Sequence, residues 1–359
     1  MPRLDTYFRA MHQQGASDLH LVAGTLPAMR LHGELKKLKA ETLSDGALRE
    51  LLREVAPAEA WAQFEKTGDL DFAYELEGVA RFRANYFNQK NGAAAVFRLI
   101  PSKILSSEAL GLPEAVRRLS RLRKGLVLVT GPTGSGKSTT LAAIIDDVNR
   151  SRRDNIITIE DPIEFVHQSQ GCLVSHREVG THTRSFASAL RAALREDPDV
   201  ILVGEMRDKE TVALAIEAAA TGHLVFGTLH TQNAPKTVDR VIEVFTAEEQ
   251  PQIRSTLADS LKAVVAQNLL KRVDGSGRVA ALEVMIVTPA VSNLIREGKT
   301  YQIPSAIQTG KKHGMQSLEG AMIELLEQKV VDPREAYDKA VNRDLIARFL
   351  PEPPPEGAP

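Results

Sequence analysis

The pattern of hydrophobic and polar positions predicts two different arrangements of strands and helices along the chain. Up to about residue 100, short alternating segments surround helical ones. Strands are predicted at "SDLHLVAG", "PAMRLHGEL", "LDFAYEL", "ARFRANYF" and "AAAVFRLIP", and helices at "SDGALRELLREV" and "PAEAWAQFEKTG". Ser44 is expected to cap the first of these helices and Gly68 to end the second. Strands clustered around helices, without strand–helix alternation, predict an α+β domain.

After Lys124 the pattern changes to regular strand–helix alternation. Apolar strands are predicted at "LVLVT", "NIITIE", "DVILVG" and "LVFGTL", separated by helices near residues 137–150, 184–196 and 208–221. Continuous apolar strands with crossover helices indicate a parallel sheet covered on both faces. Two helical stretches, "TVDRVIEVF" and "EEQPQIRSTLADSLKAVVAQNLLKR", and a strand, "VAALEVMIV", are predicted to follow. The expected fold class is therefore α/β with a parallel-dominated sheet, preceded by a smaller α+β domain.

These changes of pattern suggest domain boundaries. We expect an N-terminal domain over residues 1–100, a linker and connecting helix over 101–123, and an α/β domain with C-terminal helices over 124–345. The last residues, "PEPPPEGAP", are proline-rich and poor in apolar side chains, and residues 346–359 are expected to be disordered.

Composition narrows the function classes. The formal net charge is -1, so no global basic field indicates nucleic-acid or membrane binding. The single cysteine, Cys172, excludes a disulfide framework and a four-cysteine zinc site. The N-terminus lacks the apolar core of a signal peptide, and no apolar run approaches the ~18 residues of a membrane span. A soluble cytoplasmic protein is the expectation.

The strongest chemical signal is "LVLVTGPTGSGKSTTLAAIIDDV", a buried strand, a glycine-rich loop and a helix start. In this context the pattern predicts a phosphate-binding loop for a nucleoside triphosphate. Lys137 is expected to reach the β- and γ-phosphates, and the Ser138 hydroxyl to ligate Mg²⁺. The expected nucleotide-binding residues are Gly131, Thr133, Gly134, Ser135, Gly136, Lys137, Ser138 and Thr139. The alternative interpretation is a glycine-rich turn with a solvated lysine.

Acidic residues follow two other predicted strands. Glu205, after the strand "DVILV", is expected to hold the water shell of the magnesium ion, although it could be an exposed strand-end glutamate. Glu160, Asp161 and Glu164 follow "NIITI", and Pro162 places them in a loop. Ligands in open α/β sheets lie beyond the carboxyl ends of the strands. One of these three acids is a candidate general base, and a solvated acidic loop is the alternative.

Two histidines flank the strand "LVFGTL". His223 precedes it and His230 follows it, so their separation of about 20 Å excludes a shared metal ion. His230 lies at the carboxyl end, on the nucleotide side, and could sense the γ-phosphate. A structural hydrogen bond is the alternative for both.

The segment "RFRANYFNQKNGAAAVFRLI" predicts a hairpin that turns between Lys90 and Asn91. That register places Arg83 directly opposite Arg98, with no acidic residue nearby in the hairpin. Opposed like charges are unfavourable. Either both side chains diverge into solvent, or an anion comes between them.

Four motifs stand in order: GPTGSGKST, TIEDPIEF, DVILVGEMRD and TGHLVFGTLHT. They resemble the Walker A, aspartate, Walker B and histidine boxes of the ATPases that drive type II secretion and type IV pili. The chain is also similar to the pilus-retraction branch of this family, in the segments "GVARFRANYFNQ", "ALREDPDVILVGEMRD" and "IQTGKKHGMQSLE". The resemblance extends from about Gly15 to Val331. In the late segment "AVSNLIRE", Ser292 stands where this branch has arginine. The phosphate loop differs from GATGTGKST, which is typical of the accessory retraction paralogue.

The resemblance implies a homohexameric ring with PAS-like N-terminal and RecA-like C-terminal domains. ATP and Mg²⁺ would be the cofactors, and the inner-membrane pilus platform protein and an accessory retraction paralogue the candidate partners. Localisation would be cytoplasmic, with peripheral association at the inner membrane. The resemblance implies catalytic roles for Glu164, Glu205, Lys137 and His230, with Glu164 the favoured water activator. It also implies that Arg83 and Arg98 contact the triphosphate.

Three other functions are considered. An accessory retraction ATPase or another secretion ATPase would use the same chemistry. A nucleic-acid translocase on a RecA-like ring would need a stretch in which basic and aromatic residues are interleaved at the pore. The sequence contains no such stretch. No nucleic-acid partner is therefore expected. A regulatory nucleotide-binding module with little turnover would not need Lys137, Glu164 and Glu205 together.

Overall fold

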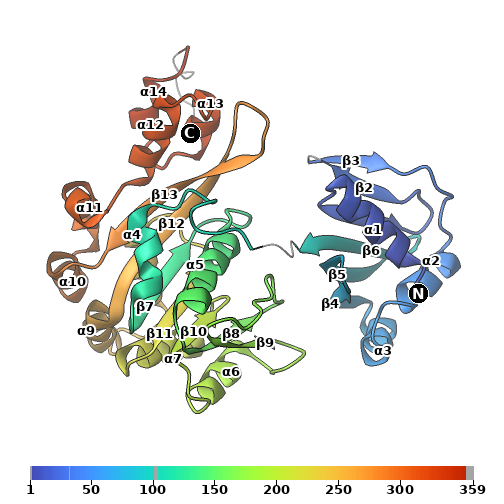
Figure 1. Cartoon of the computed structure of the whole chain (residues 1–359), viewed down its shortest axis with the longest axis horizontal. Coiled ribbons are helices and arrows are strands. Elements are labelled where there is room, and N and C mark those ends of the chain that lie inside the picture. The colour runs from blue at the N-terminus through green and yellow to red at the C-terminus, as the bar shows by residue number, and fades with distance from the viewer. Residues whose placement is uncertain (1, 32, 101–103, 353–359) are drawn as a thin grey trace. The chain divides into compact units, whose positions relative to one another are not determined.

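The computed structural model describes residues 2–31, 33–100 and 104–352. They form two compact units, with the main division of the chain after Lys103. Each unit has its own sheet and its own buried core, and is described by itself below (Figure 1).

The N-terminal unit contains an antiparallel sheet with the strand order β3-β2-β1-β6-β5-β4. The strands are β1 (Asp18–Val22), β2 (Ala28–Leu31), β3 (Glu34–Lys37), β4 (Asp69–Leu76), β5 (Ala80–Gln89) and β6 (Gly92–Ile100). The helices are α1 (Leu4–Gln14), α2 (Asp45–Arg53) and α3 (Ala58–Thr67). The predicted caps are confirmed, since the Ser44 hydroxyl accepts from Ala47 N–H and Gly68 ends α3 at a φ of 84°.

The core of this unit lies on one face of its sheet. Alternate residues such as Leu19, Phe82 and Phe97 are fully buried and pack against the three helices. Because side chains alternate along a strand, the residues between them face the opposite side. Helix α1 was not predicted, although its buried Leu4, Phe8 and Met11 recur at helical spacing.

The C-terminal unit contains a second sheet, with the order β13-β12-β7-β11-β10-β8-β9. The strands are β7 (Gly125–Thr130), β8 (Asn155–Glu160), β9 (Leu173–Glu178), β10 (Val200–Val203), β11 (Leu224–Leu229), β12 (Leu261–Lys271) and β13 (Arg278–Ile286). Neighbouring strands from β12 to β9 are parallel, and β13 is antiparallel to β12. The predicted α/β fold with a parallel-dominated sheet is confirmed.

Helices cover both faces of this sheet (Figure 1). One face packs against α4 (Glu114–Arg117) and α5 (Lys137–Ser151). The other packs against α6 (Phe186–Ala193), α7 (Lys209–Ala220), α8 (Ala234–Glu243), α9 (Gln250–Ser260), α10 (Pro289–Arg296) and α11 (Ile303–Thr309). A smaller core joins β12 and β13 to α12 (Leu318–Glu327), α13 (Pro333–Lys339) and α14 (Asp344–Ala347).

Two of the sequence predictions are wrong, and one strand was not predicted. The long helix predicted after residue 248 ends at Ser260, and the apolar run that follows it is strand β12. This run is buried between β7 and β13, where its backbone completes two ladders. Strand β9 was not predicted. The predicted tail begins within packed structure, because Ile346 is fully buried in α14, and residues 353–359 lie outside the described residues.

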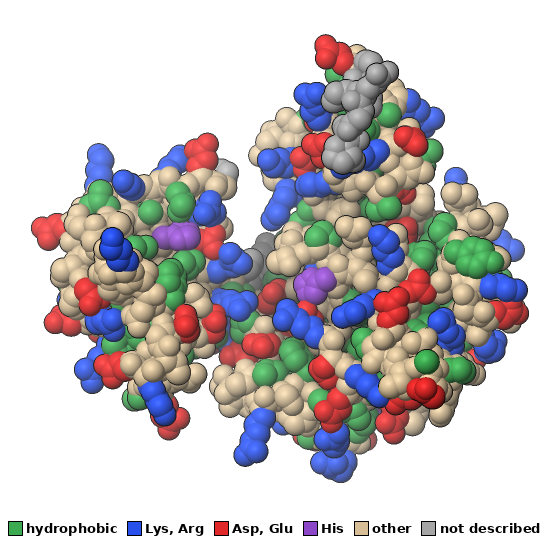
Figure 2. Space-filling model, turned by 180° about the vertical axis from the view of Figure 1, so that it is seen from behind, with side chains coloured by type: hydrophobic (Ala, Val, Ile, Leu, Met, Phe, Trp, Pro, Cys, Tyr) green, Lys and Arg blue, Asp and Glu red, His purple; other side chains and the backbone are tan. Residues whose placement is uncertain are grey.

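The surface agrees with a net charge near zero. On the face seen in Figure 2, lysine and arginine side chains are interspersed with aspartate and glutamate. Within the described ranges, no helix combines the length and the apolar character needed to cross a bilayer.

Candidate nucleotide-binding site

The predicted phosphate loop lies between β7 and α5, as its sequence requires. Strand β7 is buried along its whole length, and α5 begins directly after the loop. Gly131, Gly134 and Gly136 have φ values of 140°, 77° and 88°. A side chain at these positions would be strained, so the glycines permit the tight path of the loop. Ser138 and Thr139 lie half-buried in the first turn of α5.

The loop presents groups that suit an anion. The first N–H groups of a helix lack intrahelical partners and attract negative charge. The Oγ of Ser135 is buried and has no hydrogen-bond partner among the described residues. The Nζ of Lys137 donates to the carbonyl oxygens of Gly131 at 3.0 Å and Pro132 at 3.1 Å. This lysine is therefore folded over the loop, within reach of a ligand placed there.

A residue that sequence reasoning missed fixes the shape of the loop. Gln267, on β12, is 3% exposed, and its Nε2 donates to the Ser135 carbonyl oxygen at 2.7 Å. Its Oε1 accepts from the Thr140 hydroxyl at 2.8 Å. A Cβ at Gly131 would lie 2.3 Å from the Gln267 carbonyl oxygen, so only glycine allows this approach. The available signal was a pair of amide side chains, Gln267 and Asn268, in the apolar run "AVVAQNLL".

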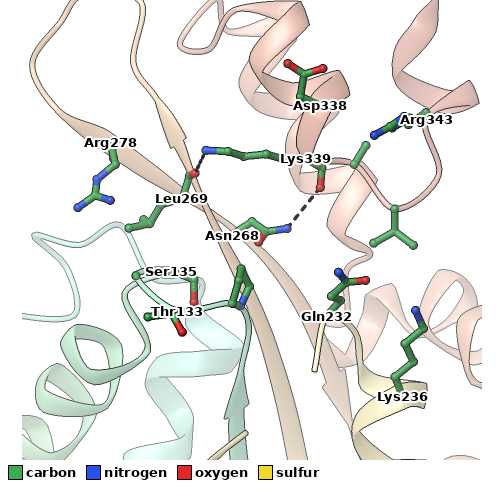
Figure 3. Close-up of a pocket in the computed structure, with 14 residues that line it drawn as sticks. Thr133, Ser135, Gln232, Lys236, Asn268, Leu269, Arg278, Asp338, Lys339 and Arg343 are labelled. Carbon is green, nitrogen blue, oxygen red and sulfur yellow. Dashed lines mark hydrogen bonds between the residues drawn. The ribbon is translucent and has the colours of Figure 1, made fainter. Parts of the chain in front are cut away.

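The outer side of the phosphate loop borders a polar pocket of about 770 Å³ (Figure 3). Thr133 and Ser135 lie on one side of it, and the ends of β12 and α13 on another. The Nζ of Lys339 donates to the Leu269 carbonyl oxygen at 2.6 Å, and Asn268 Nδ2 donates to the Lys339 carbonyl oxygen at 3.4 Å. These bonds attach the C-terminal helices to the strand that carries Gln267.

Glu205 and His230 meet at the carboxyl edge of the sheet. They follow the adjacent parallel strands β10 and β11, and His230 Nε2 donates to Glu205 Oε1 at 2.7 Å. Arg207 Nε also donates to Glu205 Oε1. Burial would raise the pKa of Glu205, but the hydrogen bonds from Arg207 and His230 outweigh it and lower the pKa. Glu205 is thus held as an anion, and Arg207 is a contact that the sequence did not predict.

His223 lies at the opposite end of β11. Its Nδ1 donates to the Ala218 carbonyl oxygen at 3.0 Å, which is a helix-end contact. His223 therefore makes a structural hydrogen bond, whereas His230 contacts Glu205, a predicted site residue.

The acidic loop after β8 has the irregular conformation expected from Pro162. Glu160 is the last residue of β8 and is 8% exposed, while Asp161 and Glu164 are exposed in the loop. The N–H of Ile163 donates to Glu178 Oε2 at 3.0 Å. Since β7, β8, β10 and β11 are parallel, Asp161, the phosphate loop, Glu205 and His230 all follow strand ends at one edge of the sheet.

In the N-terminal unit, the predicted pairing of Arg83 with Arg98 is confirmed. The hairpin itself supplies no carboxylate, as its sequence predicts, but two carboxylates reach the arginines from neighbouring strands. Arg98 Nε donates to Asp18 Oδ1 on β1 at 2.9 Å, and Arg83 Nε lies 3.7 Å from Asp71 Oδ1 on β4. The acids come from the strands that flank the hairpin, so the hairpin sequence could not reveal them. Both arginines remain substantially solvent-accessible, with side chains 46% (Arg83) and 67% (Arg98) exposed.

A third arginine shares this face. Arg30, on β2, pairs with Asp18 in register, and its Nε lies 3.8 Å from Asp18 Oδ2. Burial would raise the pKa of Asp18, but hydrogen bonds from Ser17 and Arg98 lower it below its usual value. One buried anion therefore holds two guanidinium groups on the face opposite the core.

Ser292, which departs from the motif of the resembled branch, lies on α10. Its hydroxyl donates to the Ala258 carbonyl oxygen near the end of α9 at 2.8 Å. In this chain the position joins two helices.

Comparison with known proteins identifies the family. The chain matches the family described as type II/IV secretion system protein over residues 3–337. It is 54% identical over 328 residues to the type IV pilus retraction ATPase PilT of Pseudomonas aeruginosa, covering 91% of this chain and 95% of that protein. It is 39% identical over 332 residues to the type IV pilus ATPase PilU of the same organism, covering 92% and 87%. The crystal structure of the pilus retraction motor PilT with bound ADP matches with a TM-score of 0.89 and 43% identity, covering 96% of this chain and 98% of that one. The chain therefore belongs to the type II/IV secretion system protein family.

Proposed function

We propose that this protein is a motor ATPase that hydrolyses ATP to drive retraction of a type IV pilus. The observation that carries the proposal is the near full-length similarity to the Pseudomonas retraction ATPase. The phosphate loop supports the chemistry, since it offers an anion Lys137, the α5 N-terminus and a Ser135 hydroxyl that has no partner in the described part of the chain. The lower identity to PilU favours the principal motor over the accessory ATPase.

The assigned roles follow from the chemistry of each group. The triphosphate would bind along the loop from Gly131 to Thr139, with Lys137 at the β- and γ-phosphates. A carboxylate in the acidic loop, Glu164, would orient and deprotonate the attacking water. His230 would donate a hydrogen bond to the γ-phosphate once it releases Glu205.

The donor set at the edge of the sheet fits a magnesium ion. The Ser138 hydroxyl and the ionised Glu205 carboxylate are oxygen ligands, which Mg²⁺ prefers. Ser138 would hold the ion directly and Glu205 through a water molecule. The bound ion would supply charge neutralisation at the β- and γ-phosphates.

The domain assignment completes the proposal. Residues 1–100 would form the domain that supplies Arg83 and Arg98 to the phosphates, residues 101–123 the connection, and residues 124–345 the ATPase domain. A homohexamer in the cytoplasm, peripherally attached to the inner membrane through the pilus platform protein, would transmit domain motion to the pilus. An accessory ATPase paralogue would be a further partner.

A deletion strain complemented with wild-type protein or Lys137→Ala tests this function. Loss of twitching with excess surface pili, restored by wild type and not by Lys137→Ala, is the expected result. Loss of surface pili would instead indicate an assembly motor. Purified wild-type protein without ATPase activity would overturn the enzymatic assignment.

A further inference from the structure

The acidic loop, residues 161–170 between β8 and β9, depends on other elements for its position. Its backbone forms neither helix nor strand, so no regular ladder holds it. It carries Glu164, the residue assigned above to water activation. The reaction needs this carboxylate in a narrow range of positions, since small displacements of a catalytic group are costly. The contacts that hold the loop therefore bear on turnover.

Side chains of strand β9 make hydrogen bonds to the backbone of the acidic loop. It pairs in parallel with β8, so that Thr158 lies opposite His176 and Glu160 opposite Glu178. Residues two apart on a strand point to the same side. His176 and Glu178 therefore lie next to one another on the side where they reach the acidic loop.

Glu178 holds the loop before Glu164. Its Oε2 accepts from the N–H of Ile163, a buried residue, at 3.0 Å. Its Oε1 accepts from the Thr181 hydroxyl at 3.1 Å, and its own N–H donates to His182 Nδ1 at 3.0 Å. Glu178 is buried, and hydrogen bonds hold both its carboxylate and its backbone N–H. Its position is therefore defined, and it can hold the backbone of Ile163.

His176 holds the loop after Glu164. Its Nε2 accepts from the N–H of His167 at 3.0 Å when the ring proton is on Nδ1, and it lies 3.2 Å from the His167 carbonyl oxygen, to which it donates in the other tautomer. That Nδ1 lies 2.9 Å from Thr158 Oγ1, so the hydroxyl of β8 completes the arrangement. The rings of His176 and His167 stack with centroids 5.9 Å apart. The second anchor therefore combines a hydrogen bond with ring packing.

We propose that Glu178 and His176 are positioning residues that hold the acidic loop at Ile163 and His167 and thereby set the rate at which bound ATP is hydrolysed. The inference rests on the proposed ATPase function and on Glu164 as its water activator. Among the described residues, Glu178 hydrogen-bonds Ile163 and Thr181, and His176 hydrogen-bonds His167 and Thr158, which all lie outside the phosphate loop. Their loss should therefore lower kcat while KM for ATP and affinity for ADP stay close to wild type.

Full-length Glu178→Ala and His176→Ala test the proposal. We expect kcat to fall by roughly 10- to 100-fold, the cost of a displaced catalytic group. Ser175→Ala is the matched control, because Ser175 is exposed on the same strand and points to the other face. Its kcat should equal that of wild type. Retained ADP binding shows that each variant is folded.

Two further readouts separate positioning from packing. His176→Gln keeps an acceptor for His167 N–H, whereas His176→Leu is of similar size and has none, so only the glutamine variant should recover most of the wild-type kcat. Hydrogen–deuterium exchange should accelerate over residues 161–170 in the alanine variants and stay unchanged over the phosphate loop. If His176→Ala fails to bind ADP, the Gln–Leu pair decides; if Glu178→Ala fails, the same pair at Glu178 decides, since only glutamine keeps an acceptor for Ile163 N–H.

Wild-type kcat in both alanine variants, equal kcat in the Gln and Leu variants, or unchanged exchange of the loop would overturn the proposal. These outcomes leave the proposed function intact, provided that wild-type protein hydrolyses ATP. If wild-type protein has no ATPase activity, the proposed function fails first.

Discussion

Arg98 and Asp18 form a hydrogen-bonded ion pair across the β1–β6 ladder, with 2.9 Å between Nε and Oδ1. They are 80 residues apart in the sequence, and Asp18 is buried while the guanidinium group is largely exposed. The pair stabilises two directly opposed arginines, Arg83 and Arg98, which would otherwise repel one another. The two guanidinium groups therefore lie on an exposed face, each close to a carboxylate.

From this arrangement we predict that Arg83→Ala or Arg98→Ala lowers ATP turnover. Arginines that stabilise charge in phosphoryl transfer contribute on the order of 10³-fold or more in rate. Steady-state ATPase assays on the full-length variants measure the effect, and ADP affinity reports whether the ATPase domain is folded. Arg9→Ala, an exposed arginine on α1, is the control. Wild-type turnover in both test variants would mean that Arg83 and Arg98 are solvated surface residues that do not act on the triphosphate.

The Glu205–His230 hydrogen bond gives a second prediction. Glu205→Gln removes the negative charge that Arg207 and His230 share, and should lower kcat on the order of 10²-fold, as loss of one electrostatic contact in an active site does. His230→Gln should also lower kcat, whereas His223→Gln, at the other end of β11, should not. Equal activity of the two histidine variants would contradict the difference that the structure makes between them.

Gln267 gives a third prediction. Gln267→Leu leaves the Ser135 carbonyl oxygen and the Thr140 hydroxyl without their partner, at about 1–3 kcal/mol for each buried group. The phosphate loop should lose its shape, and ADP affinity measured by calorimetry should fall about tenfold, which corresponds to 1.4 kcal/mol. The matched control is Gln316→Leu, which removes a bond to the Leu282 carbonyl oxygen outside the loop. An ADP affinity equal in both variants would show that the loop keeps its shape without Gln267.

Glu283 gives a prediction about pH. Its Oε1 accepts from the N–H of Ala234, the first residue of α8, at 2.6 Å. Burial raises the pKa of Glu283 to about 7, and the nearby charge of Glu319 adds to this, against hydrogen bonds from Ala234 and Leu318 that lower it. Between the ordinary value of 4.5 and about 7, the folded protein binds a proton that the unfolded chain does not. The free energy of unfolding should therefore decrease as pH rises through this window, by on the order of 3 kcal/mol.

Urea denaturation of wild type and Glu283→Gln at about pH 5 and about pH 8 measures this effect. Glutamine keeps an acceptor for Ala234 N–H and does not titrate, so the variant should lose less stability between the two pH values than wild type. The same loss in both proteins would mean that another group is responsible.

The sequence by itself determined the features that depend on local pattern. Apolar runs alternating with helices predicted the parallel-dominated sheet, and the glycines around Lys137 predicted the phosphate loop between β7 and α5. The two-residue turn after Gln89 set the register of Arg83 and Arg98, because a tight turn fixes which residues face one another. Each of these signals lies within a few residues of what it predicts.

Only the tertiary structure decided features whose partners are distant in the chain. The run Leu261–Lys271 is apolar enough for a helix or a strand, and ladders with β7 and β13 made it a strand. Gln267 lies 132 residues from Ser135, and Asp18 enters the arginine pair from a strand outside the hairpin. Pairing between distant residues depends on how whole helices and strands pack, so the residues next to them in the sequence do not predict it. The candidate site residues could therefore be predicted from the sequence, and distant residues such as Gln267 and Asp18 that contact predicted site residues could not.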